Sequence, residues 1–101
     1  MARRRSPLAR TIDYFVEQGY AVDVVERRVG PVTKDLFGFI DALAIRRDET
    51  VALQVTSCSN MSARVKKIVD SDLVGRVREA GWRILVVGWD HRDQPRIVDV
   101  S

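Results

Sequence analysis

The stretch "RILVVGW", residues 83–89, places the strongest constraint on the fold, because it is a nearly continuous apolar run of strand length. A run of this kind is typical of a strand that is buried on both faces of a sheet. Such a sheet is stable when helices cover its faces. The segment therefore predicts an α/β fold with this strand in the interior.

Hydrophobic periodicity and turn residues predict the first half of the chain. Ser6 and Pro7 predict the start of a helix that ends at Gly19. Its apolar face consists of residues at helical spacing, namely Leu8, Ile12, Phe15 and Val16. Strands are expected over 20–29, 39–45 and 51–56, with a loop over 30–35 and a four-residue turn over 46–49.

From about Asn60 the apolar residues recur at helical spacing, which predicts two helices before the strand at 83–89. The first helix has an apolar face made of Met61, Val65, Ile68 and Val69. The second begins near Ser71, ends at Gly81 and carries Leu73, Val74, Val77 and Ala80. With a last strand over 96–100, the predicted order is α-β-β-β-α-β-β.

Length and composition limit the class of protein. A chain of 101 residues predicts one domain over 1–101, with a basic N-terminal arm over 1–6. The single cysteine, Cys58, excludes an internal disulfide, and one Cys with one His cannot supply a structural zinc site. Because no signal peptide or membrane span is evident, we expect a soluble, cytoplasmic protein.

The charges form two basic clusters although the net charge is only +3. The first cluster comprises Arg3, Arg4, Arg5 and Arg10, and the second comprises Arg64, Lys66, Lys67, Arg76 and Arg78. Such clusters suit the phosphate backbone of a nucleic acid. The alternative is a solubilising tail and solvated helix faces.

The expected hairpin of strands 39–45 and 51–56 carries polar residues inside otherwise apolar segments. If Ile45 faces Thr50 across the turn, Asp41 lies opposite Gln54. The same register places Phe39 opposite Thr56, and strand alternation puts Gln54 and Thr56 on one face. A carboxylate, an amide and a hydroxyl are thus expected to converge on one patch.

A buried Asp41 needs a partner, because an unpaired carboxylate is costly to bury. Hard oxygen ligands of this kind suit Mg²⁺ or Mn²⁺. The alternative is that Asp41 only accepts hydrogen bonds from Gln54 and Thr56.

The segment Gly38-Phe-Ile-Asp41 followed by Gln54-Val-Thr56 resembles the PD-(D/E)XK nuclease superfamily, over about residues 8–90. That superfamily includes restriction endonucleases, Holliday-junction resolvases and small phage nucleases. The resemblance implies a restriction-endonuclease-like αβββαβ core, with a mixed central sheet flanked by helices. It also implies that Asp41 binds a metal ion, that Gln54 stands at the (D/E) position, and that the Val55 carbonyl is a further ligand.

Two departures from the family pattern bear on activity. Gln54 brings no negative charge, and Thr56 occupies the place of the lysine that orients the attacking water. Asp35 or Glu26 could replace the missing acid, although a turn cap and an edge salt bridge are the alternatives for them. The role of the missing lysine could be taken by Lys34 or by a residue of a polar stripe on the helix after the hairpin. The stripe consists of Asn60, Arg64 and Lys67, which recur at helical spacing. The alternative for the stripe is a solvated flank of the helix.

The function expected from the resemblance is a Mg²⁺- or Mn²⁺-dependent endonuclease that hydrolyses DNA, including junctions or branched DNA. Asp41, Gln54 and Lys67 are the expected catalytic residues, and the expected metal ligands are Asp41, Asp35, Val55 and Glu26. DNA contacts are expected from Arg64, Lys66, Lys34, Arg3, Arg4 and Arg5. The alternatives are a non-catalytic DNA-binding module with the nuclease fold and, less favoured, a small interaction domain. A homodimer is expected, because two-fold pairing is the commonest assembly.

Overall fold

A computed structural model describes residues 5–101 of the chain, and the first two arginines of the expected basic arm, Arg3 and Arg4, lie outside this range. The helices are α1 (Pro7–Glu17), α2 (Met61–Val69) and α3 (Val74–Glu79), with a short 3₁₀ turn, η1 (Cys58–Asn60), before α2. The strands are β1 (Ala21–Val24), β2 (Arg27–Val29), β3 (Val32–Lys34), β4 (Ala42–Arg46), β5 (Glu49–Ser57), β6 (Arg83–Trp89) and β7 (Arg96–Asp99).

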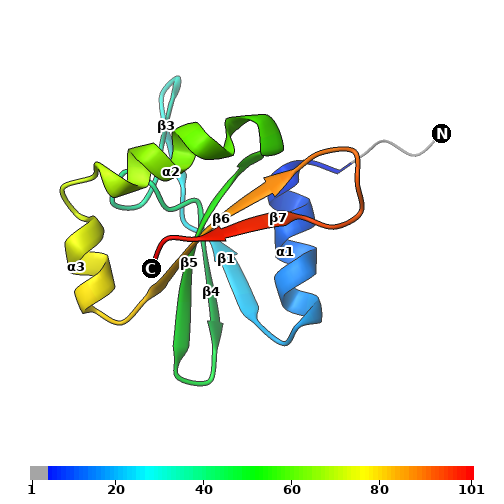
Figure 1. Cartoon of the computed structure of the whole chain (residues 1–101), viewed down its shortest axis with the longest axis horizontal. Coiled ribbons are helices and arrows are strands. Elements are labelled where there is room, and N and C mark those ends of the chain that lie inside the picture. Colours follow the sequence, from blue (N-terminus) through cyan, green and yellow to red (C-terminus); the bar gives the residue numbers. More distant parts are fainter. Residues whose placement is uncertain (1–4) are drawn as a thin grey trace.

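Five strands form one mixed sheet in the order β1-β4-β5-β6-β7. β5 and β6 run parallel, and the other neighbouring pairs run antiparallel. The parallel pair is possible because α2 and α3 lie between β5 and β6 in the chain and form the crossover connection. Figure 1 shows α1 on one side of this sheet and α2 and α3 on the other. The predicted α/β architecture, with a mixed sheet flanked by helices, is confirmed.

Each face of the sheet has its own apolar core. On one side Phe15 of α1 packs with Leu53, Val87 and Trp89. On the other side the cluster comprises Phe39, Ile40, Ala52, Met61, Ile68, Val74, Val77, Ile84 and Val86. β6 is buried from Ile84 to Trp89, as the apolar run predicted.

The helices begin largely as predicted, but their buried faces differ at single residues. The Ser6 hydroxyl accepts a hydrogen bond from the Ala9 amide, which confirms the predicted N-cap of α1. Val16 is wrong as a core residue, because it is half exposed, and Thr11 is buried instead. The Thr11 hydroxyl donates to the Pro7 carbonyl and accepts from the Trp89 indole at 2.8 Å, so this polar group is satisfied. On α2 and beside α3, Val69 and Leu73 are likewise exposed.

The single strand expected over 20–29 is divided into β1 and β2. The amides of Val25 and Glu26 both donate to the Asp41 carbonyl, at 2.9 and 3.2 Å. Two successive amides sharing one acceptor is the hydrogen-bond pattern of a β-bulge, which bends a strand and redirects its side chains. The chain therefore leaves the main sheet at Glu26.

The loop expected over 30–35 contains β3, which the sequence analysis missed. β2 and β3 form a separate two-stranded sheet joined by Gly30 and Pro31. Figure 1 shows this hairpin projecting from the body of the molecule. We call it the ribbon, residues 27–34.

The central hairpin has the predicted register, but its first strand begins later than predicted, its second strand is longer, and its loop is shorter. Ile45 pairs with Thr50, as expected, and the pairing of Arg46 with Glu49 reduces the loop to two residues. β4 begins at Ala42 rather than at Phe39, because the chain turns before it through Phe37 and Gly38, both with positive φ. The predicted Phe39–Thr56 pair is therefore not part of the ladder, which ends at Ala42 and Leu53.

Gly88 of β6 allows α2 to approach the sheet closely. A Cβ at this position would lie 2.3 Å from the Met61 sulfur, so only glycine leaves room for that side chain. Met61 is the first residue of α2. Met61 therefore packs against β6 at the start of the helix that carries Arg64 and Lys67.

Within residues 5–101, no helix has the length and apolar character needed to cross a bilayer.

Candidate functional site

Asp41 lies just before β4, at the point where the chain enters the central hairpin. One carboxylate oxygen, Oδ2, accepts hydrogen bonds from the Gln54 side-chain Nε2 at 2.7 Å and from the Val55 amide at 2.8 Å. The expected convergence of Asp41 and Gln54 is therefore confirmed. Neither of these bonds uses Oδ1, which leaves that oxygen available to a further partner.

Two more carboxylates lie beside Asp41. The bulge directs Glu26 towards the site. Asp35 follows the last residue of the ribbon, where the chain comes back to the site. One carboxylate oxygen from each of Glu26, Asp35 and Asp41 lies within 4.8 Å of the others. The residues proposed from the sequence as replacements for the missing acid are thus brought together, although they come from three separate segments.

The environment of Asp41 disfavours its charged form. Burial is the largest cause and raises the pKa of Asp41 to about 7, and the carboxylates of Asp35 and Glu26 raise it further, against the opposing effect of the Val55 amide. Like charges held this close are unfavourable unless a proton or a cation lies between them. The cluster is therefore electrostatically unsatisfied at neutral pH.

The three acids line an open cleft of about 500 Å³. Its other lining residues are Ser6, Pro7, Leu8, Thr33, Val55, Thr56, Ser57, Arg64 and Lys67. The Lys67 ammonium lies 3.5 Å from Asp35 Oδ2, so the helix after the hairpin delivers positive charge to the acidic cluster. Two of the three residues of the predicted polar stripe, Arg64 and Lys67, border the cleft.

The donor set of the cleft fits a hard divalent cation. Oxygens on opposite sides of a Mg²⁺ ion lie about 4.1 Å apart, since each Mg–O distance is about 2.05 Å. The 4.8 Å spread of the carboxylates therefore requires only a small rotation of side chains to enclose such an ion. Val55 can add a ligand: its amide points at Asp41, and the amide and carbonyl of one strand residue point to the same side.

Gln54 and Thr56 do not take the roles of an acid and a lysine. Gln54 presents its amide nitrogen to Asp41, and its Oε1 is buried without a hydrogen-bond partner among the described residues. Thr56 is buried and lines the cleft. Gln54 therefore orients the Asp41 carboxylate, and the negative charge of the site comes from Glu26 and Asp35.

The residues predicted to contact DNA are distributed over several surfaces. Arg64 borders the cleft and Lys34 is exposed on the ribbon, whereas Lys66 pairs with Asp70 at 2.8 Å. Lys66 is not among the residues that line the cleft. Arg5 forms an ion pair with Asp13 on α1.

Thr33, Ser57 and the start of α1 are parts of the cleft wall that were not predicted from the sequence. Thr33 was assigned to a loop, whereas it lies in β3, paired with Arg28 of β2, and lines the cleft two residues before Asp35. The alternation of "RRV" and "VTK" around Gly30-Pro31 is the signal that could have indicated a hairpin.

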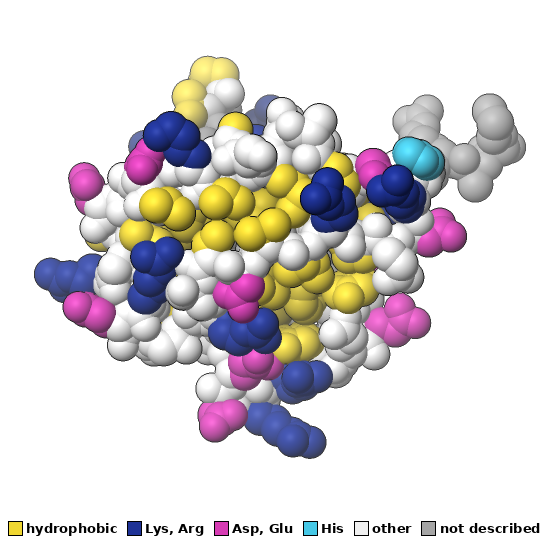
Figure 2. Space-filling model, in the orientation of Figure 1, with side chains coloured by type: hydrophobic (Ala, Val, Ile, Leu, Met, Phe, Trp, Pro, Cys, Tyr) yellow, Lys and Arg dark blue, Asp and Glu magenta, His cyan; other side chains and the backbone are white. Residues whose placement is uncertain are grey.

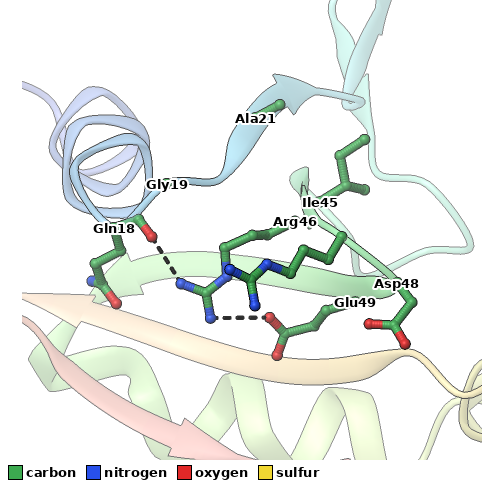
Figure 3. A pocket seen from close by; sticks show the side chains of 8 residues that line it. Gln18, Gly19, Ala21, Ile45, Arg46, Asp48 and Glu49 are labelled. Carbon is green, nitrogen blue, oxygen red and sulfur yellow. Dashed lines mark hydrogen bonds and ion pairs between the residues drawn. The ribbon is translucent and has the colours of Figure 1, made fainter.

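A larger hollow, about 960 Å³, lies at the opposite end of the central hairpin and contains both acids and arginines. Figure 3 shows the Arg46 side chain reaching the Gln18 carbonyl and Glu49, and these contacts measure 2.8 and 3.5 Å. Glu49 also accepts hydrogen bonds from the Tyr20 hydroxyl and from Arg83. Because Glu49 is surrounded by donors, it forms a closed network with Arg46, Arg83 and Tyr20 and requires no ligand.

Comparison of the chain with models of known protein families gives no match, and comparison with curated proteins gives none either.

Proposed function

We propose that the protein is a divalent-metal-dependent endonuclease that hydrolyses DNA. The observation that carries the proposal is the convergence of Glu26, Asp35 and Asp41 in a cleft bordered by Arg64 and Lys67. Carboxylates that enclose a hard cation, next to basic side chains, form a site suited to a phosphodiester.

The arrangement of the elements supports the resemblance to the PD-(D/E)XK superfamily. The elements α1, β1, β4, β5, α2 and β6 follow one another as α-β-β-β-α-β when the ribbon, η1 and the additional helix α3 are set aside. β1, β4, β5 and β6 are neighbours in that order, and β5 and β6 are parallel. Asp41 and the Gln54-Val-Thr56 segment lie together at one end of β4 and β5, as the family motif requires.

Each side chain then has a defined task. Asp41, Asp35, Glu26 and the Val55 carbonyl hold Mg²⁺ or Mn²⁺, while Gln54 keeps Asp41 in position. A bound divalent ion supplies positive charge at the scissile phosphate and lowers the pKa of the attacking water. Lys67 and Arg64 bind the phosphate oxygens and stabilise the charge that develops there, which is the role that Thr56 cannot take.

One observation favours a second candidate, a DNA-binding module without catalysis. The Gln54 amide occupies Asp41 Oδ2, and no lysine stands at position 56. If Lys67 remains paired with Asp35, its charge is not free to stabilise the reacting phosphate, and the cleft binds DNA through Arg64 without cutting it.

The test compares cleavage of linear duplex, supercoiled and four-way-junction DNA by the parent protein and by Asp41→Asn, in Mg²⁺ and in Mn²⁺. We expect the parent to cut at least one substrate and Asp41→Asn to lose that activity. Asp72→Asn is the matched control, since Asp72 is an exposed carboxylate outside the cleft. Cleavage that is equal in all three proteins would come from a contaminant and would contradict the proposal.

A second variant, Lys67→Met, separates the two candidates. If the protein is an endonuclease, this change lowers the cleavage rate at saturating metal. Metal-independent DNA binding by the parent, with no cleavage on any substrate, would instead establish the non-catalytic module.

A further inference from the structure

The ribbon is attached directly to the acidic cluster. Glu26 precedes β2 and Asp35 follows β3, so the two site carboxylates flank residues 27–34 on both sides. The two strands pair only with each other, and every residue from 27 to 34 is exposed. A short two-stranded element that packs on nothing gains little stability from burial. Stabilisation of the fold therefore does not explain the ribbon, and its position next to the cleft indicates a role in binding.

The charge of the ribbon is entirely positive. It carries Arg27, Arg28 and Lys34 and no acidic residue. Arg27 and Lys34 stand directly opposite each other, and like charges in this position destabilise a strand pair. Among residues 5–101, neither of these side chains nor Arg28 forms an ion pair or a side-chain hydrogen bond. A polyanion would neutralise all three.

The tip of the ribbon is apolar. Val29 and Val32 pair across the Gly30-Pro31 turn and are 50% and 51% exposed. Figure 2 shows hydrophobic side chains at the end of this projection, and the strand register places Arg27, Arg28 and Lys34 nearer to its base. The ribbon thus has a charged base and an apolar end.

The two faces of the ribbon have different orientations relative to the cleft. Thr33 lines the cleft, and Arg28 is its direct partner across the strand pair. Directly paired side chains lie on the same face, so Arg28 is on the cleft side of the ribbon. Arg27, Val29, Val32 and Lys34 share the other face, because strand side chains alternate.

We infer that the ribbon enters the major groove of a B-form DNA duplex whose backbone lies in the cleft. A two-stranded β-ribbon fits this groove, which is about 12 Å wide and 8.5 Å deep. The ribbon reaches about 10 Å from its base, since each strand residue adds about 3.3 Å. Arg28 contacts the strand that enters the cleft, and Arg27 and Lys34 contact phosphates at the groove edge.

The apolar tip indicates which chemical group of the base pairs the ribbon contacts in the major groove. Val29 and Val32 have no polar side-chain atoms, so they match the one apolar group that base pairs present there, the C5-methyl of thymine. An A-form RNA duplex has a major groove too deep and narrow for the ribbon. This inference extends the proposed function by naming its substrate as duplex DNA, but it concerns binding and does not require cleavage.

The first test measures binding of a fluorescent DNA duplex to the parent and to Arg27→Gln/Arg28→Gln/Lys34→Gln over a range of salt concentrations, without divalent metal. Each phosphate contact contributes about 0.9 to the slope of log K against log salt, so the slope should fall by about 2–3 in the variant. Arg47→Gln/Arg92→Gln/Arg96→Gln is the matched control, because it removes the same charge from exposed residues outside the cleft and outside both basic clusters. An equal loss in both triple variants would overturn the inference.

The second test concerns the groove. Replacing thymine by uracil removes only the methyl group from the major groove, and we expect severalfold weaker binding by the parent. Val29→Ser/Val32→Ser should bind thymine and uracil duplexes alike, with the salt slope of the parent. Insertion in the major groove would be contradicted if the parent bound thymine and uracil duplexes equally well. It would also be contradicted if the charge variant lost as much affinity for an RNA duplex as for a DNA duplex.

The outcomes separate this inference from the proposed function. Ribbon-dependent duplex binding by a protein that cuts no DNA would retain the inference and reject the endonuclease. Cleavage of duplex DNA that is unchanged in the ribbon variants would retain the endonuclease and reject the inference.

Discussion

The two ends of the central hairpin place carboxylates in opposite environments. At the turn, Glu49 receives hydrogen bonds from the Tyr20 hydroxyl and from Arg83, which lower its pKa. At the open end, Asp41 is buried beside Asp35 and Glu26, and its pKa rises to about 7. Both ends are hollowed, and the end with Glu49 is the larger hollow.

The two ends differ in whether the fold itself balances the charge of the carboxylates. Around Glu49 the opposite charges are present, and Glu49 itself is paired with Arg46 and Arg83 and accepts from Tyr20, so its carboxylate needs no further partner. Around Asp41 three acids face one nearby ammonium at 3.5 Å, and the charge is not balanced within the cluster. Unfavourable electrostatics that the fold itself does not relieve indicate a role for a ligand.

The largest expected effect concerns activity. Asp41→Asn should lower DNA cleavage by about a thousandfold, ~4 kcal/mol in activation free energy, because it removes a charged ligand at the reacting phosphate. Glu49→Gln should leave the rate nearly unchanged. Cleavage rates of both variants at saturating metal test these expectations. Equal losses of activity in the two variants would show that the Asp41 end of the hairpin is no more important for cleavage than the Glu49 end.

The next effect concerns stability as a function of pH. The folded state holds a proton on Asp41 up to about pH 7, whereas the unfolded chain releases it near the ordinary value of 3.8. The metal-free protein should therefore lose about 2–3 kcal/mol of unfolding free energy between pH 5 and pH 8, since one pKa unit corresponds to about 1.4 kcal/mol.

Asp41→Asn should abolish most of this pH dependence and be more stable than the parent at pH 8. The contribution of Glu49 to stability changes with pH in the opposite direction. Because its pKa is lowered in the folded state, Glu49 contributes stability at neutral pH that is lost on acidification. Urea denaturation of the parent and both variants at several pH values measures these slopes. A parent protein more stable at pH 8 than at pH 5 would show that Asp41 is not the dominant group.

A smaller effect is stabilisation by metal. At pH 8 and a free Mn²⁺ concentration tenfold above the Kd at that pH, the parent should gain about 1.4 kcal/mol of unfolding free energy, seen as a higher Tm. At the same Mn²⁺ concentration the gain should be smaller at pH 6, because the ion must then displace the proton of Asp41. Glu49→Gln should keep this response and Asp41→Asn should lose it; retention by Asp41→Asn would place the ion elsewhere.

The smallest effect tests the closed network. Tyr20→Phe removes the hydroxyl that donates to Glu49 at 2.5 Å while keeping the ring contacts with Phe15 and Arg46. We expect a loss of about 1 kcal/mol in unfolding free energy and no change in cleavage. A large loss of activity in this variant would mean that the two ends are coupled.

Much of the architecture follows from local sequence. The apolar run 83–89 predicted the buried strand, Ser6-Pro7 predicted the start of α1, and the polar turn after Ile45 predicted the register that brings Asp41 to Gln54. The errors occur where distant segments decide the outcome. Strand 20–29 breaks because Asp41, 16 positions after Val25, offers its carbonyl to two amides.

The candidate site shows the same division. The sequence identified Asp41, Asp35, Glu26 and Lys67, since polar residues in or beside apolar strands are informative about chemistry. It could not show that Gln54 presents its nitrogen rather than its oxygen, or that the ribbon returns Asp35 to Glu26. The direction of this hydrogen bond and the approach of Asp35 to Glu26 both depend on atoms from several segments at once.

The α/β class, the register of the central hairpin and the types of residue available for chemistry follow from local sequence, because periodicity and turn residues act over a few positions. Which acids lie close together, and which are neutralised by arginine, depends on how distant segments pack. Electrostatic interactions depend on distance and burial rather than on position in the chain, so Glu49 and Asp41 acquire opposite pKa shifts from the fold alone.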